Sequence, residues 1–181
     1  MKLFEINLYK FHSNPETLHG HDVAHETIPE LVYNTAESGK KLTDKQEYTL
    51  AKDPYYAYQY ALNVLEKPFP KGEDAIAKDP EHAYNYAYHI LDKPFPKGEY
   101  IIIKNPRYAY LYAKNVLKKP WPKGEDVLAK NSEYAYRYAQ YVLKKPWPKG
   151  ETAIAKDLHW AYEYARYVLK LPEAEAKRWH K

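Results

Sequence analysis

The chain of 181 residues contains no cysteine and only six glycines, and its serines are limited to Ser13, Ser38 and Ser132. The absence of cysteine excludes disulfides and thiolate metal sites, and it favours a reducing compartment. With so few serines and no glycine-rich loop, the sequence offers neither a nucleophile motif nor a phosphate-binding fingerprint. We therefore expect a non-enzymatic protein that uses no cofactor.

Long apolar runs are also missing. No stretch approaches the roughly 20 apolar residues that a membrane-spanning helix needs, and the apolar N-terminal stretch is interrupted by Glu5, Asn7 and Lys10. Such interruptions are not typical of a signal peptide. We expect a non-secreted, cytoplasmic protein with no membrane partner.

The net charge of +4 is unevenly distributed along the chain. Residues 1–43 hold four lysines and six acidic residues, whereas residues 44–181 hold 24 lysines and arginines against 18 acidic residues. The second part is therefore mildly basic, which makes binding to nucleic acid an open possibility but does not establish it.

A repeat of 26 residues dominates the sequence. The pair Ala-Tyr recurs without insertion or deletion at Ala57, Ala83, Ala109, Ala135 and Ala161. A unit this short cannot bury its own apolar face, so successive units must stack on one another. The repetition predicts an all-α fold, an α-solenoid of about five two-helix repeats with caps at both ends.

Each unit is expected to contain a longer helix and a short one. Asp53 and its copies stand where an N-cap is required, and a proline often follows at the first helical position. The long helix then runs for about 12 residues and ends before Pro68 or its copies. The segment 72–78, "GEDAIAK", follows a Pro-Phe-Pro turn and predicts the short helix.

These patterns divide the chain into four parts. Residues 1–26 form a non-repeat leader, and residues 27–52 form a degenerate capping repeat in which Gly39 ends the first helix and Asp44 caps the second. The regular array covers residues 53–170. Residues 171–181 replace the next turn with a polar segment that predicts a C-terminal capping helix.

Units of the form G-E-x-x-I-A-K-D-P-x-x-A-Y-x-Y-A-x-x-V-L-K-x-P-[FW]-P resemble short helical repeats of bacteriophage and bacterial proteins. They are more loosely similar to variant leucine-rich repeats, which alternate an α-helix with a short helix. The resemblance covers residues 44–170 and transfers no catalytic residue. It implies a binding role, with a bacteriophage origin and a host protein as target.

One histidine cluster lies in the leader. If residues 21–25 are helical, His21 and His25 share a face at a spacing suited to zinc, with His19 or Asp22 as a third ligand. The alternative is a polar leader with several surface histidines, and we favour this alternative because a flexible segment holds metal ligands poorly.

Lysines flank the aromatic residue of each turn, and copies of this edge recur at every unit. A single-stranded nucleic acid binds to such surfaces, because bases stack on rings and phosphates pair with cations. Alternatively, the lysines complement the helix dipoles and the rings pack inside the turn. The candidate nucleic-acid-binding residues are Lys119, Trp121, Lys123, Lys145, Trp147 and Lys149.

The far side of the long helix carries aromatic residues with variable polar neighbours, and it is richest in the last two units. Tyr, Trp and Arg supply most binding hot spots, so this face predicts a protein-binding surface. The alternatives are that the rings pack on the next unit, or that a pocket of Tyr and Lys binds a nucleotide-like ligand. Exposed rings also favour self-association. The candidate protein-binding residues are Tyr134, Arg137, Tyr141, Trp160, Tyr164 and Tyr167.

Overall fold

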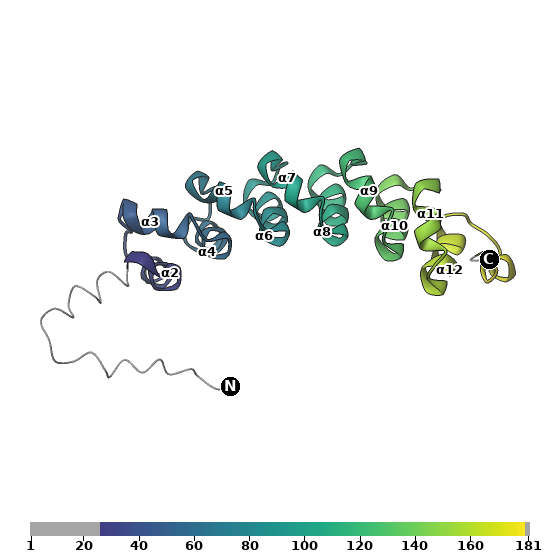
Figure 1. Cartoon of the computed structure of the whole chain (residues 1–181), viewed down its shortest axis with the longest axis horizontal. Helices are drawn as coiled ribbons and strands as arrows, with labels where there is room; N and C mark the ends of the chain where they lie inside the picture. Colours follow the sequence, from purple (N-terminus) through teal and green to yellow (C-terminus); the bar gives the residue numbers. More distant parts are fainter. Residues whose placement is uncertain (1–25, 180–181) are drawn as a thin grey trace, which may run out of the picture.

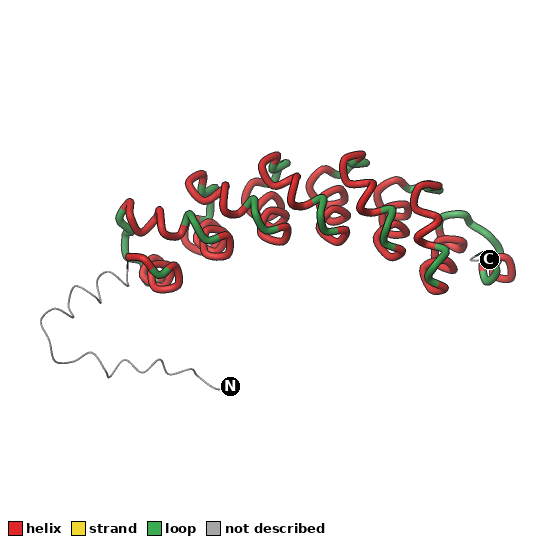
Figure 2. The backbone as a smooth tube through the Cα atoms, in the orientation of Figure 1, coloured by secondary structure: helices red, strands yellow, loops and turns green. Residues whose placement is uncertain are grey.

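The computed structural model describes residues 26–179, which fold mostly into helices arranged in two layers (Figure 1). The long helices of successive repeats lie side by side in one layer, and the short helices form the other. The array follows a gentle arch with the long helices on its inner side, and short loops join the two layers (Figure 2). Residues 26–179 contain no strand. The prediction of an all-α solenoid is confirmed.

In the first four repeats the long helix begins as an α-helix and continues as a π-helix. These pairs are α4 (Pro54–Gln59) with η2 (Tyr60–Leu65), α6 (Pro80–Asn85) with η4 (Tyr86–Leu91), α8 (Pro106–Leu111) with η5 (Tyr112–Leu117), and α10 (Ser132–Tyr138) with η7 (Ala139–Leu143). In the fifth repeat α12 (Leu158–Tyr167) has no π-helical part. The short helices are η3 (Pro70–Gly72) with α5 (Glu73–Ile76), α7 (Pro96–Ile102), η6 (Pro122–Gly124) with α9 (Glu125–Leu128), and α11 (Pro148–Ile154).

The long helices begin where their caps predict. The side chain of Asp53 accepts the backbone N–H of Tyr56 at 2.9 Å, and Asp79 accepts that of His82 at 2.9 Å. Asn131 does the same in the fourth repeat even though a serine replaces the following proline. The cap satisfies an N–H that has no partner inside the helix, which fixes the start of each long helix.

The long helices end on residues in the left-handed conformation, and none of these residues is glycine. The five residues are Glu66, Asp92, Lys118, Lys144 and Lys170, with φ between 45° and 63°. In all five repeats the next residue precedes a proline, which disfavours the α conformation there and ends the helix. The carbonyl of Ala61 accepts the N–H groups of both Glu66 and Lys67. Sequence reasoning located these ends but missed their geometry, because no glycine marks the position.

The core is built from tyrosine, alanine, the phenylalanine or tryptophan of each turn, and one large aliphatic residue per short helix. Four tyrosines that occupy the same repeat position are completely buried, and each bonds to the preceding repeat through its hydroxyl group. The hydroxyl of Tyr112, for example, accepts the backbone N–H of Phe95 at 2.8 Å and donates to Glu99 Oε1 at 3.3 Å. Tyr86, Tyr138 and Tyr164 make the equivalent pairs of bonds. These tyrosines therefore join adjacent repeats by satisfying a buried backbone donor.

The N-terminal capping repeat contains α2 (Pro29–Glu37) and α3 (Asp44–Leu50). Gly39, with φ of +83°, lies just beyond α2 as predicted. The prediction that Asp44 caps α3 is wrong, because Thr43 is the N-cap. The Thr43 hydroxyl accepts the N–H of Gln46 at 3.3 Å, and the Gln46 side chain accepts the N–H of Thr43 at 3.0 Å. Asp44 instead lies in the first turn, 3.3 Å from Lys71.

The C-terminal end is closed by α13 (Glu173–Ala176) and the residues that follow it. The ring of Trp179 lies 5.0 Å from the ring of Tyr164, so it covers a tyrosine that a further repeat would otherwise cover. Across the described part of the chain, no helix is both long and apolar enough to cross a membrane.

Candidate binding surface

The inner layer of long helices carries the side chains that differ most between repeats. At the position of Asn63 the later repeats carry His89, Asn115, Tyr141 and Tyr167. Tyr141 on η7 and Tyr167 at the end of α12 are 46% and 48% exposed, respectively. Two large phenol rings therefore stand at equivalent places on neighbouring helices and face solvent.

Of the six candidate protein-binding residues, Tyr141 and Tyr167 are exposed, and Tyr134 and Trp160 are half-buried. Trp160 stacks on Tyr136 with ring centroids 5.5 Å apart, and Tyr134 lies 6.1 Å from Tyr110. Tyr110 and Tyr136 are buried, so the half-buried rings rest on the core. They form a rigid support beneath the exposed phenols.

The prediction that Tyr164 contacts a partner is wrong. Tyr164 is completely buried, and its hydroxyl bonds to the backbone N–H of Trp147 at 2.7 Å and to Glu151 at 2.8 Å. Its position is tyrosine in all five repeats, and this invariance within the array was a signal of a structural role. The variable positions, in contrast, are those that the fold does not constrain.

Arg137 is held in place by two interactions. Its Nε lies 2.8 Å from Glu133 Oε1 in an i,i+4 ion pair, and its guanidinium lies over the ring of Trp160 at 5.6 Å. The carboxylate offsets the positive charge locally, so Arg137 contributes shape and hydrogen-bond donors more than net charge.

The ring of Tyr136 lies between Tyr141 and Trp160, with its centroid 6.5 Å from that of Tyr141. Burial raises the pKa of Tyr136 above the ordinary tyrosine value, and the nearby Tyr141 and Glu163 act in the same direction. A side-chain hydrogen bond to Tyr141 also raises this pKa, so the Tyr136 hydroxyl is engaged with the exposed Tyr141 at the base of this surface.

The expectation that Trp121 and Trp147 offer ring faces to bases is wrong. The two side chains are only 5% and 7% exposed. Trp121 packs on Tyr112 at 4.9 Å and Trp147 packs on Tyr138 at 5.1 Å, each within its own repeat. The prolines on either side fold the turn so that the ring points into the core, where it adds buried apolar area.

Two of the candidate lysines are engaged in ion pairs between repeats. Lys123 lies 3.0 Å from Glu99, and Lys149 lies 2.8 Å from Asp126. Lys71 and Lys97 make the same kind of pair with the repeat before them. The turn lysines therefore neutralise the first-turn acids of the preceding short helix. Lys119 and Lys145 are exposed, and within residues 26–179 they form no ion pair.

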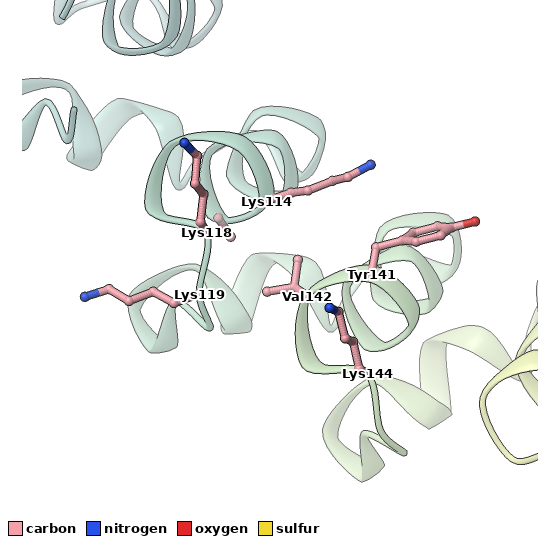
Figure 3. A pocket seen from close by; sticks show the side chains of 7 residues that line it. Lys114, Lys118, Lys119, Tyr141, Val142 and Lys144 are labelled. Carbon is pink, nitrogen blue, oxygen red and sulfur yellow. The ribbon is translucent and has the colours of Figure 1, made fainter. Parts of the chain in front are cut away.

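A groove of about 310 Å³ opens between the third and fourth repeats, where their long helices end (Figure 3). The half-buried Val142 supplies apolar surface, Tyr141 stands beside it, and Figure 3 shows Lys118 and Lys144 at the two helix ends. The lining lysines are Lys114, Lys118, Lys119 and Lys144. Lys114 was not among the predicted site residues. Its repeat position nevertheless varies in the way expected of a binding site, because the other repeats hold Leu62, Tyr88, Gln140 and Arg166 there.

The Nζ atom of Lys114 lies 5.0 Å from the centre of the Tyr141 ring and 5.6 Å from that of Tyr110. A cation over an aromatic face is attracted by the ring quadrupole. This contact links the lysine groove to the exposed tyrosines, so the two features form one continuous surface.

The metal candidates His19, His21 and His25 lie outside the described residues. Within residues 26–179 no group of three metal-ligating side chains comes together. Comparison of the chain with protein-family models, curated proteins and solved structures finds no match.

Proposed function

We propose that this protein is a non-enzymatic binding scaffold that engages a cellular protein through the inner face of its fourth and fifth repeats. The exposed phenols of Tyr141 and Tyr167 contact the partner, and Tyr134, Arg137 and Trp160 support them. We further propose that the scaffold acts in the cytoplasm and, if it is encoded by a bacteriophage, that its target is a host protein.

The adjacent exposure of Tyr141 and Tyr167 is the single observation that carries this proposal. Large aromatic rings held on a rigid base contribute contact area at a low entropic cost, which makes them effective anchors in protein interfaces. The earlier repeats hold Asn63, His89 and Asn115 at the same position, so the fold does not require tyrosine there.

The repeated carboxylates support a non-enzymatic role. Glu73, Glu99, Glu125 and Glu151 each accept a hydrogen bond from the buried tyrosine of the next repeat, and three of them also pair with a turn lysine. These acids are used to hold repeats together. We do not carry the nucleic-acid alternative forward, because its rings are buried and two of its four lysines, Lys123 and Lys149, are paired with acids.

The test is affinity capture from nuclease-treated lysate with a doubly substituted chain, Tyr141→Ala and Tyr167→Ala. The matched control is Tyr48→Ala with Tyr100→Ala, which removes two tyrosines that are at least as exposed but lie on short helices. We expect a discrete protein to be retained by the wild type and the control and lost from the double variant. Retention by the double variant would refute the proposal.

A further inference from the structure

We infer that the partner presents an acidic peptide segment with an apolar side chain between its carboxylates, and that this segment occupies the groove between the third and fourth repeats. The inference rests on the proposed function and specifies the chemistry of the partner. It is carried by four lysines, by their lack of counter-charges, and by the apolar surface between them.

The fold does not require lysine at the ends of the long helices. Lys118 and Lys144 have φ of 54° and 55°, and Glu66 and Asp92 occupy the same repeat position with φ of 50° and 45°. A lysine at a helix C-terminus complements the dipole, yet the first two helices end on an acid instead. The backbone conformation is the same with an acid or a lysine at this position. The change to lysine at the third repeat therefore alters the surface charge without being needed for the fold.

Lys114 makes the groove differ from the other repeat boundaries. The first, second and fourth repeats hold Leu62, Tyr88 and Gln140 at this position. Lys114 is therefore the only cation at this position that has a following repeat beside it. Its ammonium group also lies over the Tyr141 ring. A bound carboxylate at the groove would therefore lie close to the phenol that anchors the partner.

The lysines of the groove have no counter-charge of their own. Among the described residues, Lys114, Lys118, Lys119 and Lys144 form no ion pair, and no carboxylate lines the groove. The turn lysines of the same repeats are paired with acids 2.8–3.0 Å away. An acidic ligand supplies the counter-charge that these lysines lack, so the groove attracts negative charge.

The apolar surface of the groove favours a peptide over a nucleic acid. Val142 is half-buried and lies between the lysines, where it suits a small aliphatic side chain, and the buried Ala113 lies beneath it. A nucleic-acid strand needs ring faces for its bases and a continuous row of cations for its phosphates. The turn tryptophans are buried, and the pairing of Lys123 and Lys149 with acids removes two of the cations that a row of phosphates would use.

The probe is a short fluorescein-labelled peptide of glutamates around one leucine, with binding followed by fluorescence anisotropy. The groove variant combines Lys114→Leu, Lys118→Glu and Lys144→Glu, which are the residues that the first repeat already holds as Leu62 and Glu66. The control combines Lys78→Glu, Lys130→Glu and Lys156→Gln. It makes the same change in net charge at exposed lysines that follow the short helices.

We expect the wild type and the control to bind the acidic peptide, with an affinity that falls as salt is raised. The groove variant should bind at least about tenfold more weakly, because it loses three attractive charges and gains two repulsive ones. Circular dichroism of each variant verifies that the helices are retained. Replacing the leucine of the peptide by serine should weaken binding severalfold, and equal binding would overturn the role of the apolar surface.

Two results would overturn the acidic partner. One is that the wild type does not bind the peptide at low salt, although capture of a protein from lysate still depends on Tyr141 and Tyr167. That result refutes this inference and leaves the proposed function standing. The other is groove-dependent binding of an oligothymidylate strand that is tighter than binding of the peptide. If capture does not depend on the tyrosines, the proposed function fails whatever the peptide does.

Discussion

The hydroxyl of Tyr112 allows a quantitative test of how the repeats are held together. Tyr112→Phe removes the group that accepts the N–H of Phe95 at 2.8 Å, in a site where the tyrosine is completely buried. Leaving a buried donor without a partner costs about 1–3 kcal/mol. The bond to Glu99 is longer, at 3.3 Å, and Glu99 keeps Lys123 as a partner, so its loss adds little.

We therefore expect Tyr112→Phe to lower the free energy of unfolding by about 2 kcal/mol. For a chain of this size that corresponds to a fall in Tm of roughly 4–8 °C. The substitution lies in the middle of the array, so the loss of coupling between the second and third repeats should also broaden the transition. Urea and thermal unfolding followed by circular dichroism measure both effects.

The matched control is Tyr60→Phe. Tyr60 occupies the same repeat position, but its hydroxyl contacts only Glu47, at 3.4 Å, because the N–H of Thr43 is already bonded to Gln46. This substitution leaves no buried donor unpaired and should cost less than about 0.5 kcal/mol. Equal costs for the two substitutions would refute the argument that satisfying the backbone N–H is what makes tyrosine necessary.

Two further predictions concern alkaline pH and glycine packing. Burial raises the pKa of Tyr86 and Tyr138 to about 12, whereas an unfolded tyrosine titrates near pH ~10. The unfolded chain loses its protons first, so stability should be constant below about pH 10 and fall progressively up to about pH 12. The buried tyrosines should ionise together with the loss of helix content, and ionisation of all the tyrosines with the helices intact would contradict this. Gly98→Ala should destabilise the protein by about 1–3 kcal/mol in urea, because the new Cβ would lie 2.6 Å from the Phe95 ring and 2.8 Å from Ala83 Cβ. Gly39→Ala does not meet such neighbours, and its cost should come from the positive φ alone.

Sequence reasoning predicted the exposure of some residues of the proposed surface correctly and of others wrongly. Tyr141 and Tyr167 were predicted as exposed contacts and are exposed, whereas Tyr164 was predicted in the same set and is buried. The helical spacing places Tyr164 near the edge of the apolar stripe. A residue there is buried only if the preceding repeat packs over it, and the helical spacing does not show this. Its hydroxyl meets a backbone N–H 17 residues earlier in the chain, and no local pattern reports such a contact.

The sequence by itself determined the helices, their caps and the need for stacking. Those signals act within a single unit of 26 residues: Asp53 caps the helix that begins one residue later, and Pro68 prevents its continuation. The tertiary structure decided which rings are available, which lysines are neutralised and where a groove opens. Tyr164 is buried against the preceding repeat and Lys123 is paired with Glu99 because of how residues of different repeats meet. Burial and counter-charge are set by contacts between units, and only the stacked array contains those contacts.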